Sequence, residues 1–166
     1  MKSAVLAIST AQRKGMVLHI EDLWKSRKYK IETFYLAVNI ADHYLMKLAS
    51  LNRVAPCLVH LGTTALLLAA KIEESLSPCV INLIILIKKK HQIKIEKKAL
   101  INLESSIIRE LAFDIRFISP LDFLERLQRL FCVDQADPYS KVIGDVAKQL
   151  CRLMLISSNF LQYKPS

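Results

Sequence analysis

The sequence predicts an all-α fold, and three of its features support this. The 166-residue chain has only 3 glycines and 5 prolines, which leaves few tight turns and favours long helices joined by short loops. Hydrophobic residues make up 52% of the chain and charged residues 23%, as in a globular domain with a sizeable core. Apolar residues recur at spacings of three and four along most of the chain, which is the period of a helix buried on one face.

Three helices are expected in the first half of the chain. The first runs from about Gly15 to Lys25, with a face made of Met16, Ile20, Leu23 and Trp24. The second, Glu32 to Ala49, carries a broad apolar stripe typical of an amphipathic helix. The third, Val59 to Glu74, follows Pro56 and is apolar nearly all round, so we expect it to lie at the centre of the fold.

Two more helices complete the first domain. A helix from about Val80 to Lys90 follows Pro78, and another spans Lys97 to Leu111 with apolar residues at helical spacing. With the third helix enclosed by the other four, these elements predict a five-helix bundle, and we assign residues 1–116 to it.

Residues 117–166 are expected to form the first helices of a second, truncated helical domain. Ser119 precedes a proline and Asp122 lies in the first turn, which is typical of a helix start, so we place a helix from Ser119 to Phe131. A further helix is expected from Tyr139 to Leu161. Its apolar surface exceeds what one short neighbour can cover, which favours a natural protein that continues beyond Ser166.

Lys71 is the main candidate for a functional residue, because it is a cation within an apolar helix. Helical spacing places Leu68, Lys71 and Ile72 on one face, and Glu104 and Ile108 on one face of the fifth helix. Side by side, these faces would form a shallow apolar groove with one cation and one carboxylate. Such a groove suits the binding of a helix from another protein, through its free backbone groups and apolar side chains. The alternative is a solvated Lys71 and a Glu104 on an ordinary wet surface.

A second charged pair has a structural interpretation. Arg13, at the start of the first helix, and Asp42, in the second, could form a buried salt bridge that fixes how the two helices cross. Two separate surface charges are the alternative.

The remaining composition argues against several classes of protein. The net charge of +9 permits a nucleic-acid partner, but the basic segment from Lys88 to Lys98 has no interleaved aromatic residues to stack on bases, which favours a solvated surface. The four cysteines lie far apart, so we expect reduced, mostly buried thiols and no metal site.

The motifs of enzymes are also missing from the sequence. There is no nucleophile elbow, no glycine-rich phosphate loop and no ligand cluster, so neither an enzyme, a cofactor nor a small-molecule substrate is expected. The four histidines are interpreted as core-edge or surface residues. No segment predicts a signal peptide or a membrane span, and we expect a nuclear or cytoplasmic protein.

Several segments resemble the cyclin box of cell-cycle cyclins. These are "IETFYLAVNIADHYL", "LGTTALLLAAKIEES" and "LESSIIRELAFDI" followed by "SPLDFLERL", in the family's order and approximate spacing. The resemblance covers about Arg13 to Ile115 for the first box, and the tail resembles the start of a second, incomplete cyclin fold.

The resemblance implies a partner and the residues that bind it. The partner would be a cyclin-dependent protein kinase, which the chain would activate by holding the regulatory helix of the kinase in its active position. Arg13 and Asp42 match the family's internal salt bridge, and Lys71 and Glu104 match its contacts to the kinase helix and the preceding loop. A pocket for an isoleucine of that helix is implied at Leu68, Ile72, Ile108, Phe113 and Ile115. His60 stands where the family has a leucine.

A second site of the family is poorly matched. Some cyclins recruit substrates with an Arg-x-Leu motif through an apolar patch on the first helix. At positions of that patch this chain has Gly15 and His19, so we expect weak or absent docking of this kind. Two alternatives to kinase activation stay open: a transcription-factor-like module, and a cyclin-fold adaptor that does not activate a kinase.

Overall fold

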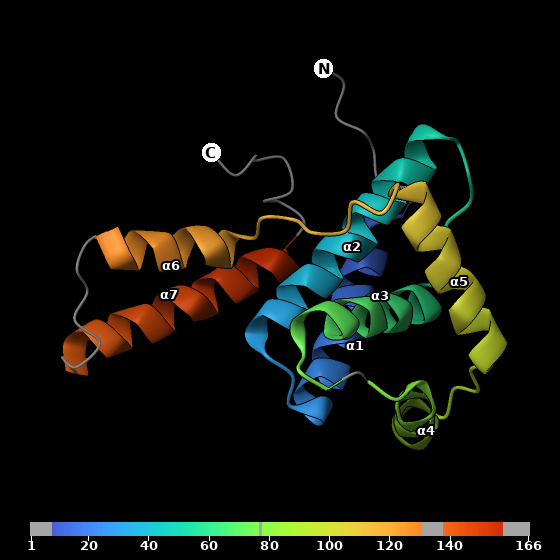
Figure 1. The fold of residues 1–166 in the computed structure, drawn as a ribbon, viewed down its shortest axis with the longest axis horizontal. Helices are drawn as coiled ribbons and strands as arrows, with labels where there is room; N and C mark the ends of the chain where they lie inside the picture. Colours follow the sequence, from blue (N-terminus) through green and yellow to red (C-terminus); the bar gives the residue numbers. More distant parts are fainter. Residues whose placement is uncertain (1–7, 77, 131–137, 158–166) are drawn as a thin grey trace. The chain divides into compact units, whose positions relative to one another are not determined.

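The computed structural model describes residues 8–76, 78–130 and 138–157, and within them the only regular secondary structure is helical. The chain divides into two compact units, Met1–Phe117 and Ile118–Ser166. The helices, drawn in Figure 1, are α1 (Thr10–Arg27), α2 (Ile31–Ser50), α3 (Leu58–Glu73), α4 (Val80–His91), α5 (Lys97–Glu110), α6 (Pro120–Leu130) and α7 (Pro138–Ile156). The predicted all-α class is therefore confirmed.

The centre of the first unit is α3. Every residue from Leu61 to Ala70 is buried, and α3 packs against α1, α2 and α5 (Figure 1). A helix that is apolar on nearly all sides is stable only where neighbours cover all of its faces, and this one is covered in that way. The predicted central helix is confirmed.

The first helix begins five residues earlier than predicted. Ser9 and Gln12 form a capping box, in which Gln12 N–H donates to Ser9 Oγ at 3.2 Å and Ser9 N–H donates to Gln12 Oε1 at 2.9 Å. These two bonds satisfy free backbone groups at the start of α1, so the helix extends back to Thr10. The apolar spacing used for the prediction misses this polar first turn.

The end of α3 is bonded to the start of α2. Lys30, the residue before α2, has no side-chain cap of its own. Glu74, which follows α3, accepts hydrogen bonds at Oε1 from Lys30 N–H at 2.8 Å and from the Thr33 hydroxyl at 2.6 Å. A carboxylate at a helix N-terminus also interacts favourably with the helix dipole. These bonds hold the last turn of α3, which carries Lys71, against α2.

The cysteines are less buried than predicted. Cys57 and Cys79 are exposed and Cys151 is half-buried, while Cys132 lies outside the described residues. The physical reason is position: Cys57 and Cys79 are the cap residues immediately before α3 and α4. They therefore belong to connecting segments and not to the apolar face of a helix.

The second unit is a pair of contacting helices. Ser119 and Asp122 cap α6 reciprocally, since Ser119 N–H donates to Asp122 Oδ2 at 2.6 Å and Asp122 N–H donates to Ser119 Oγ at 3.3 Å. This is the helix start that the sequence predicts. The predicted end of the last helix at Leu161 lies outside the described residues. No helix in the described ranges has the length and apolar character that a membrane span requires.

Candidate functional site

Lys71 of α3 and Glu104 of α5 form an ion pair in which Lys71 Nζ donates to Glu104 Oε1. The Lys71 side chain is 37% exposed and that of Glu104 15%, so the pair lies at the surface but is partly covered. The structure thus brings together the two charged residues singled out in the sequence, and they are not two separate solvated groups. We call the surface formed by Lys71, Ile72, Glu104 and Ile108 the α3–α5 face.

Contacts from α2 and the residues after it position α5 beside α3. The Tyr44 hydroxyl of α2 lies 3.1 Å from the Ser106 hydroxyl of α5. Arg53, which follows α2, donates to Glu110 Oε1 at 2.6 Å near the end of α5. Ile107, on the same helix, is fully buried. These contacts fix the rotation of α5, which is why Glu104 meets Lys71.

The predicted pocket residues differ in how accessible they are. Leu68 is only 3% exposed, so its side chain lies beneath the surface and supports the α3–α5 face from below. Ile72, Ile108 and Ile115 are half-buried. Phe113 is 79% exposed, which is unusual for a phenylalanine. The side chains available to a partner are therefore Phe113 and the three isoleucines.

The backbone after α5 determines where Phe113 lies. Ala112 and Phe113 both have left-handed backbone conformations, with φ of 51° and 63°. Phe113 N–H donates to Ile108 O at 2.9 Å and Ala112 N–H donates to Arg109 O at 3.0 Å, which is the bonding pattern of a Schellman motif. Two consecutive left-handed residues other than glycine cost roughly 1–2 kcal/mol each. The chain carries this strain at the point where it exposes an aromatic ring.

Arg13 and Asp42 form a buried, two-pronged salt bridge between α1 and α2. Arg13 Nε donates to Asp42 Oδ1 at 2.9 Å, and Arg13 Nη2 donates to Asp42 Oδ2 at 2.6 Å. The two side chains are 1% and 6% exposed. Burial raises the pKa of Asp42, while the hydrogen bonds and charge of Arg13 act in the opposite direction. The pair fixes the crossing of α1 and α2.

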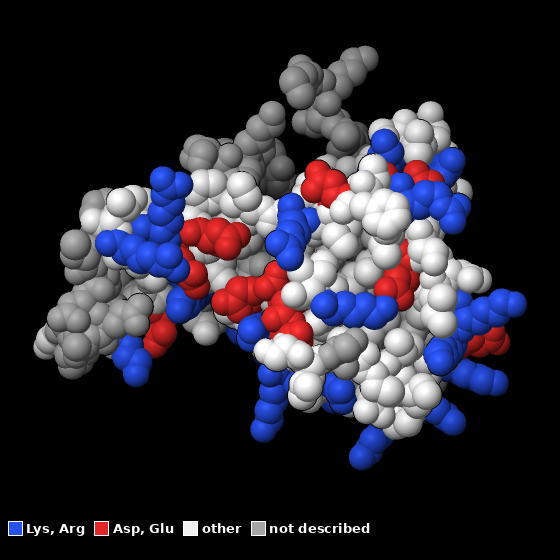
Figure 2. Space-filling model, viewed as in Figure 1, with Lys and Arg blue, Asp and Glu red and all other residues white. Residues whose placement is uncertain are grey.

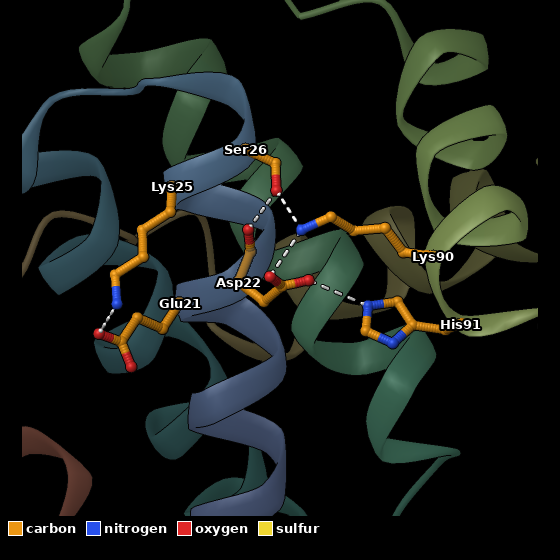
Figure 3. Close-up of polar contacts among 6 residues, drawn as sticks. All are labelled: Glu21, Asp22, Lys25, Ser26, Lys90 and His91. Carbon is orange, nitrogen blue, oxygen red and sulfur yellow. Dashed lines mark hydrogen bonds and ion pairs between the residues drawn. The ribbon is translucent and has the colours of Figure 1, made fainter.

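A polar cluster between α1 and α4 was not predicted from the sequence (Figure 3). Lys90 Nζ donates to Asp22 Oδ1 and to the Ser26 hydroxyl, each at 2.7 Å, and His91 Nε2 lies 3.2 Å from Asp22 Oδ2. The hydrogen bond from Lys90 is the main reason why the pKa of Asp22 is lowered. One feature of the sequence could have indicated this cluster. Lys90 and His91 follow the buried Ile87 at spacings of three and four, so they lie on the same inner face of α4 as Ile87.

His19 of α1 extends this cluster into the bundle. Its Nε2 lies 3.0 Å from the hydroxyl of the buried Thr63 on α3, and its ring packs edge-on against the ring of His91 at 5.1 Å between centroids. Burial, followed by the charge of His91, lowers the pKa of His19 from 6.5 to about 4, while Asp22 opposes the shift. The folded protein therefore holds His19 neutral.

This shift predicts a loss of stability in mild acid. Between pH 6.5 and about pH 4 the unfolded chain binds a proton at His19 that the folded chain excludes, so stability falls as the pH falls. At 1.36 kcal/mol per unit of pKa, the loss between pH 7 and pH 5 is about 2 kcal/mol. We expect His19→Gln to remove most of that pH dependence in urea unfolding at the two pH values. An equal pH dependence in the variant and the wild type would contradict this assignment.

The fold and the α3–α5 face define a class of protein: a helical bundle that presents an ion pair beside aliphatic side chains. Comparison with known proteins then identifies the family. Residues 2–116, well over half of the chain, match the N-terminal domain of cyclins, and the chain therefore belongs to the cyclin family.

Individual relatives agree with this assignment. G2/mitotic-specific cyclin-B3 of Gallus gallus is 30% identical over 159 residues, a match that covers 96% of this chain and 36% of the relative. G2/mitotic-specific cyclin cdc13 of Schizosaccharomyces pombe is 32% identical over 136 residues, covering 81% and 25%. This chain thus spans about a third or less of either relative. The crystal structure of a viral cyclin from herpesvirus saimiri has the same fold, with a TM-score of 0.78 at 21% identity over 96% of this chain and 66% of that one.

Proposed function

We propose that this chain binds a cyclin-dependent protein kinase through the α3–α5 face and favours the active position of the regulatory helix of the kinase. The observation that carries the proposal is the partly exposed ion pair of Lys71 and Glu104 next to half-buried isoleucines. The cyclin family assignment supports it. Such a protein would act in the nucleus or the cytoplasm, where these kinases are found, and would catalyse no reaction itself.

The physical basis is an exchange of hydrogen-bond partners. A helix terminus has free backbone N–H and C=O groups, which need partners when it is buried against another protein. Lys71 donates and Glu104 accepts, so together they can satisfy both kinds of group. The Lys71 side chain is 37% exposed in the free chain. Its ammonium group lies at the end of a flexible stem, so it can turn from Glu104 to a carbonyl of the partner.

The apolar residues would supply most of the binding energy. Phe113 is exposed and Ile72 is half-buried, while Leu68 is buried one helical turn before Ile72 on α3. A small number of well-packed apolar anchors usually dominates the energy of an interface. We therefore assign Ile72, Ile108, Phe113 and Ile115 to a pocket for an aliphatic side chain of the kinase helix, with Leu68 as its floor.

Activation would follow from selective binding. A protein kinase positions the phosphates of ATP when a strand lysine pairs with a glutamate of the regulatory helix. A partner that binds only the inward position of that helix shifts the population of the kinase toward the active state. The proposed role of this chain is to favour one kinase conformation.

Charge removal on the α3–α5 face tests the proposal. We expect Lys71→Ala and Glu104→Ala each to weaken binding to the best binder in a panel of purified cyclin-dependent kinases by about tenfold, which corresponds to 1.4 kcal/mol. Helix content and melting temperature should change little, because partly exposed ion pairs contribute less than about 1 kcal/mol to stability. Binding is measured by biolayer interferometry.

The matched control is Arg129→Ala, which removes the exposed Arg129–Glu125 ion pair on α6 and should leave kinase binding unchanged. Wild-type affinity in both test variants would refute the roles of Lys71 and Glu104. A kinase assay on the same complexes separates the two functions that a cyclin fold can have. Binding without a rise in kinase activity would assign the chain to the adaptors.

A further inference from the structure

The outer face of α4 combines exposed aliphatic side chains with unpaired positive charge. Ile81 is 52% exposed and Ile85 59% exposed, and Lys88 and Lys89 continue the same helix as exposed residues. At 100° per residue, these four side chains lie within an arc of about 100°. We call this surface, Ile81, Ile85, Lys88 and Lys89, the α4 outer face.

Contacts on the opposite side of α4 fix this orientation. Leu83 and Ile87 are 1% and 0% exposed, and Lys90 and His91 bond to Asp22 of α1 (Figure 3). The inner side of α4 therefore has both apolar and polar contacts with the rest of the first unit. The α4 outer face is held toward solvent by these contacts.

The positive charge extends past the end of α4. Lys94 lies in the following loop and Lys97 and Lys98 begin α5, which contacts α4. In the described part of the chain, none of Lys88, Lys89, Lys94, Lys97 and Lys98 forms an ion pair. Figure 2 shows blue side chains around a largely white surface at the position of α4. Glu96 is the one carboxylate within residues 88–98.

We propose that the α4 outer face binds an acidic segment of another protein that carries apolar anchors one helical turn apart. Ile81 and Ile85 are four residues apart and would contact two such anchors. Lys88 and Lys89, with the lysines that follow, would contact carboxylates beyond the anchors. Charge complementarity of this kind raises the rate of association and selects against basic partners.

Two other anionic partners use this surface less completely. Nucleic acid would contact the lysines through its phosphates, but it would gain nothing from the two isoleucines. Residues 81–98 contain no Phe, Tyr, Trp or Arg for stacking, and the one ring among them, that of His91, packs against His19. An anionic membrane would use both kinds of residue, but interfacial helices commonly carry Trp or Phe on the apolar face, and residues 81–98 contain neither. An acidic peptide matches the size and the chemistry of the surface.

Selection from a peptide library tests the proposal on the full chain. A random 16-residue library displayed on phage is selected on the wild type, and each enriched peptide is then measured against Ile85→Ser and Lys88→Glu by fluorescence polarisation. We expect peptides that lose at least tenfold in affinity for both variants, have negative net charge and carry two apolar residues four positions apart. Their affinity should fall as salt is raised.

The control variants make the same chemical changes elsewhere. Leu18→Ser removes an aliphatic side chain that is 44% exposed on α1, and Lys47→Glu reverses an exposed charge on α2. Both should bind the selected peptides like the wild type. Circular dichroism should show the same helix content in all four variants.

Three outcomes would overturn the proposal. The first is that no enriched peptide is sensitive to both substitutions, and the second is that the sensitive peptides are neutral or basic. The third is that a 12-base-pair duplex DNA, or vesicles of phosphatidylserine and phosphatidylcholine, bind the wild type tightly and lose that binding in Lys88→Glu. Kinase binding should be unchanged in Ile85→Ser, so this proposal and the proposed kinase function can fail separately.

Discussion

Replacing Asp42 with alanine is expected to destabilise the first unit by about 3–5 kcal/mol, because it removes the carboxylate that pairs with the buried Arg13 guanidinium. Arg13 is 1% exposed and makes two hydrogen bonds to the carboxylate that the variant lacks. Taking a charge out of water costs several kcal/mol, and in the wild type the paired carboxylate offsets this cost. The free energy of unfolding is measured by urea denaturation of the full chain at pH 7.

A matched double variant separates the cost of removing one member of the pair from the contribution of the whole pair to stability. Arg13→Met with Asp42→Leu replaces both groups by apolar side chains, and we expect it to recover most of the stability lost in Asp42→Ala. Arg129→Ala, which breaks the exposed Arg129–Glu125 pair, should cost less than about 1 kcal/mol. If Asp42→Ala were as mild as Arg129→Ala, the Arg13–Asp42 pair would not be buried as the structure places it.

Most of the fold could be predicted from the sequence because its helices have clear periodicity. The apolar run from Leu61 to Ala70 requires neighbours on all sides, and this places α3 at the centre. The start of α1 could not be predicted in the same way, because Ser9 and Gln12 stabilise a polar turn that has no apolar period. Only attention to capping chemistry would have found it.

The candidate site, like the fold, could be predicted from the sequence only in part. Helical spacing predicts that Lys71 and Ile72 share a face and that Glu104 and Ile108 share another, and the structure places the two charges together. Spacing cannot tell how deeply a residue lies in a bundle, which is why Leu68 was expected at the surface of a groove although it is buried. The kinase-binding roles of these residues stay a prediction.

The polar cluster around Asp22 could not be predicted from helical spacing, for a different reason. Asp22 and Lys90 are 68 residues apart in sequence, and neither interrupts an apolar pattern in the way that Lys71 does. Their contact depends on how α4 lies against α1, which is a tertiary feature. It is also the contact that directs the α4 outer face toward solvent.

Two of the helical glycines, Gly62 and Gly15, should change the free energy of unfolding in opposite directions when they are substituted. A Cβ at Gly62 of α3 would lie 3.0 Å from Ile20 Cγ1 and 3.4 Å from Met16 Cγ, and both of these α1 side chains are buried. Leucine adds three more carbons at a point where α1 and α3 already touch. Overpacking of this kind typically costs 1–3 kcal/mol, so we expect Gly62→Leu to lower the free energy of unfolding by about 3 kcal/mol.

Gly15 of α1 is the control for Gly62, because both are glycines within helices and differ in their surroundings. A Cβ at Gly15 meets no atom within 4 Å, and the residue is exposed. Alanine is favoured over glycine inside a helix by about 0.8–1.0 kcal/mol, so Gly15→Ala should stabilise the protein by about that amount. Urea denaturation of both variants measures the two changes. If Gly62→Leu raised the free energy of unfolding, α1 and α3 would have to lie further apart than the contact between Gly62 and Ile20 requires. That result would contradict the close packing of α1 on α3.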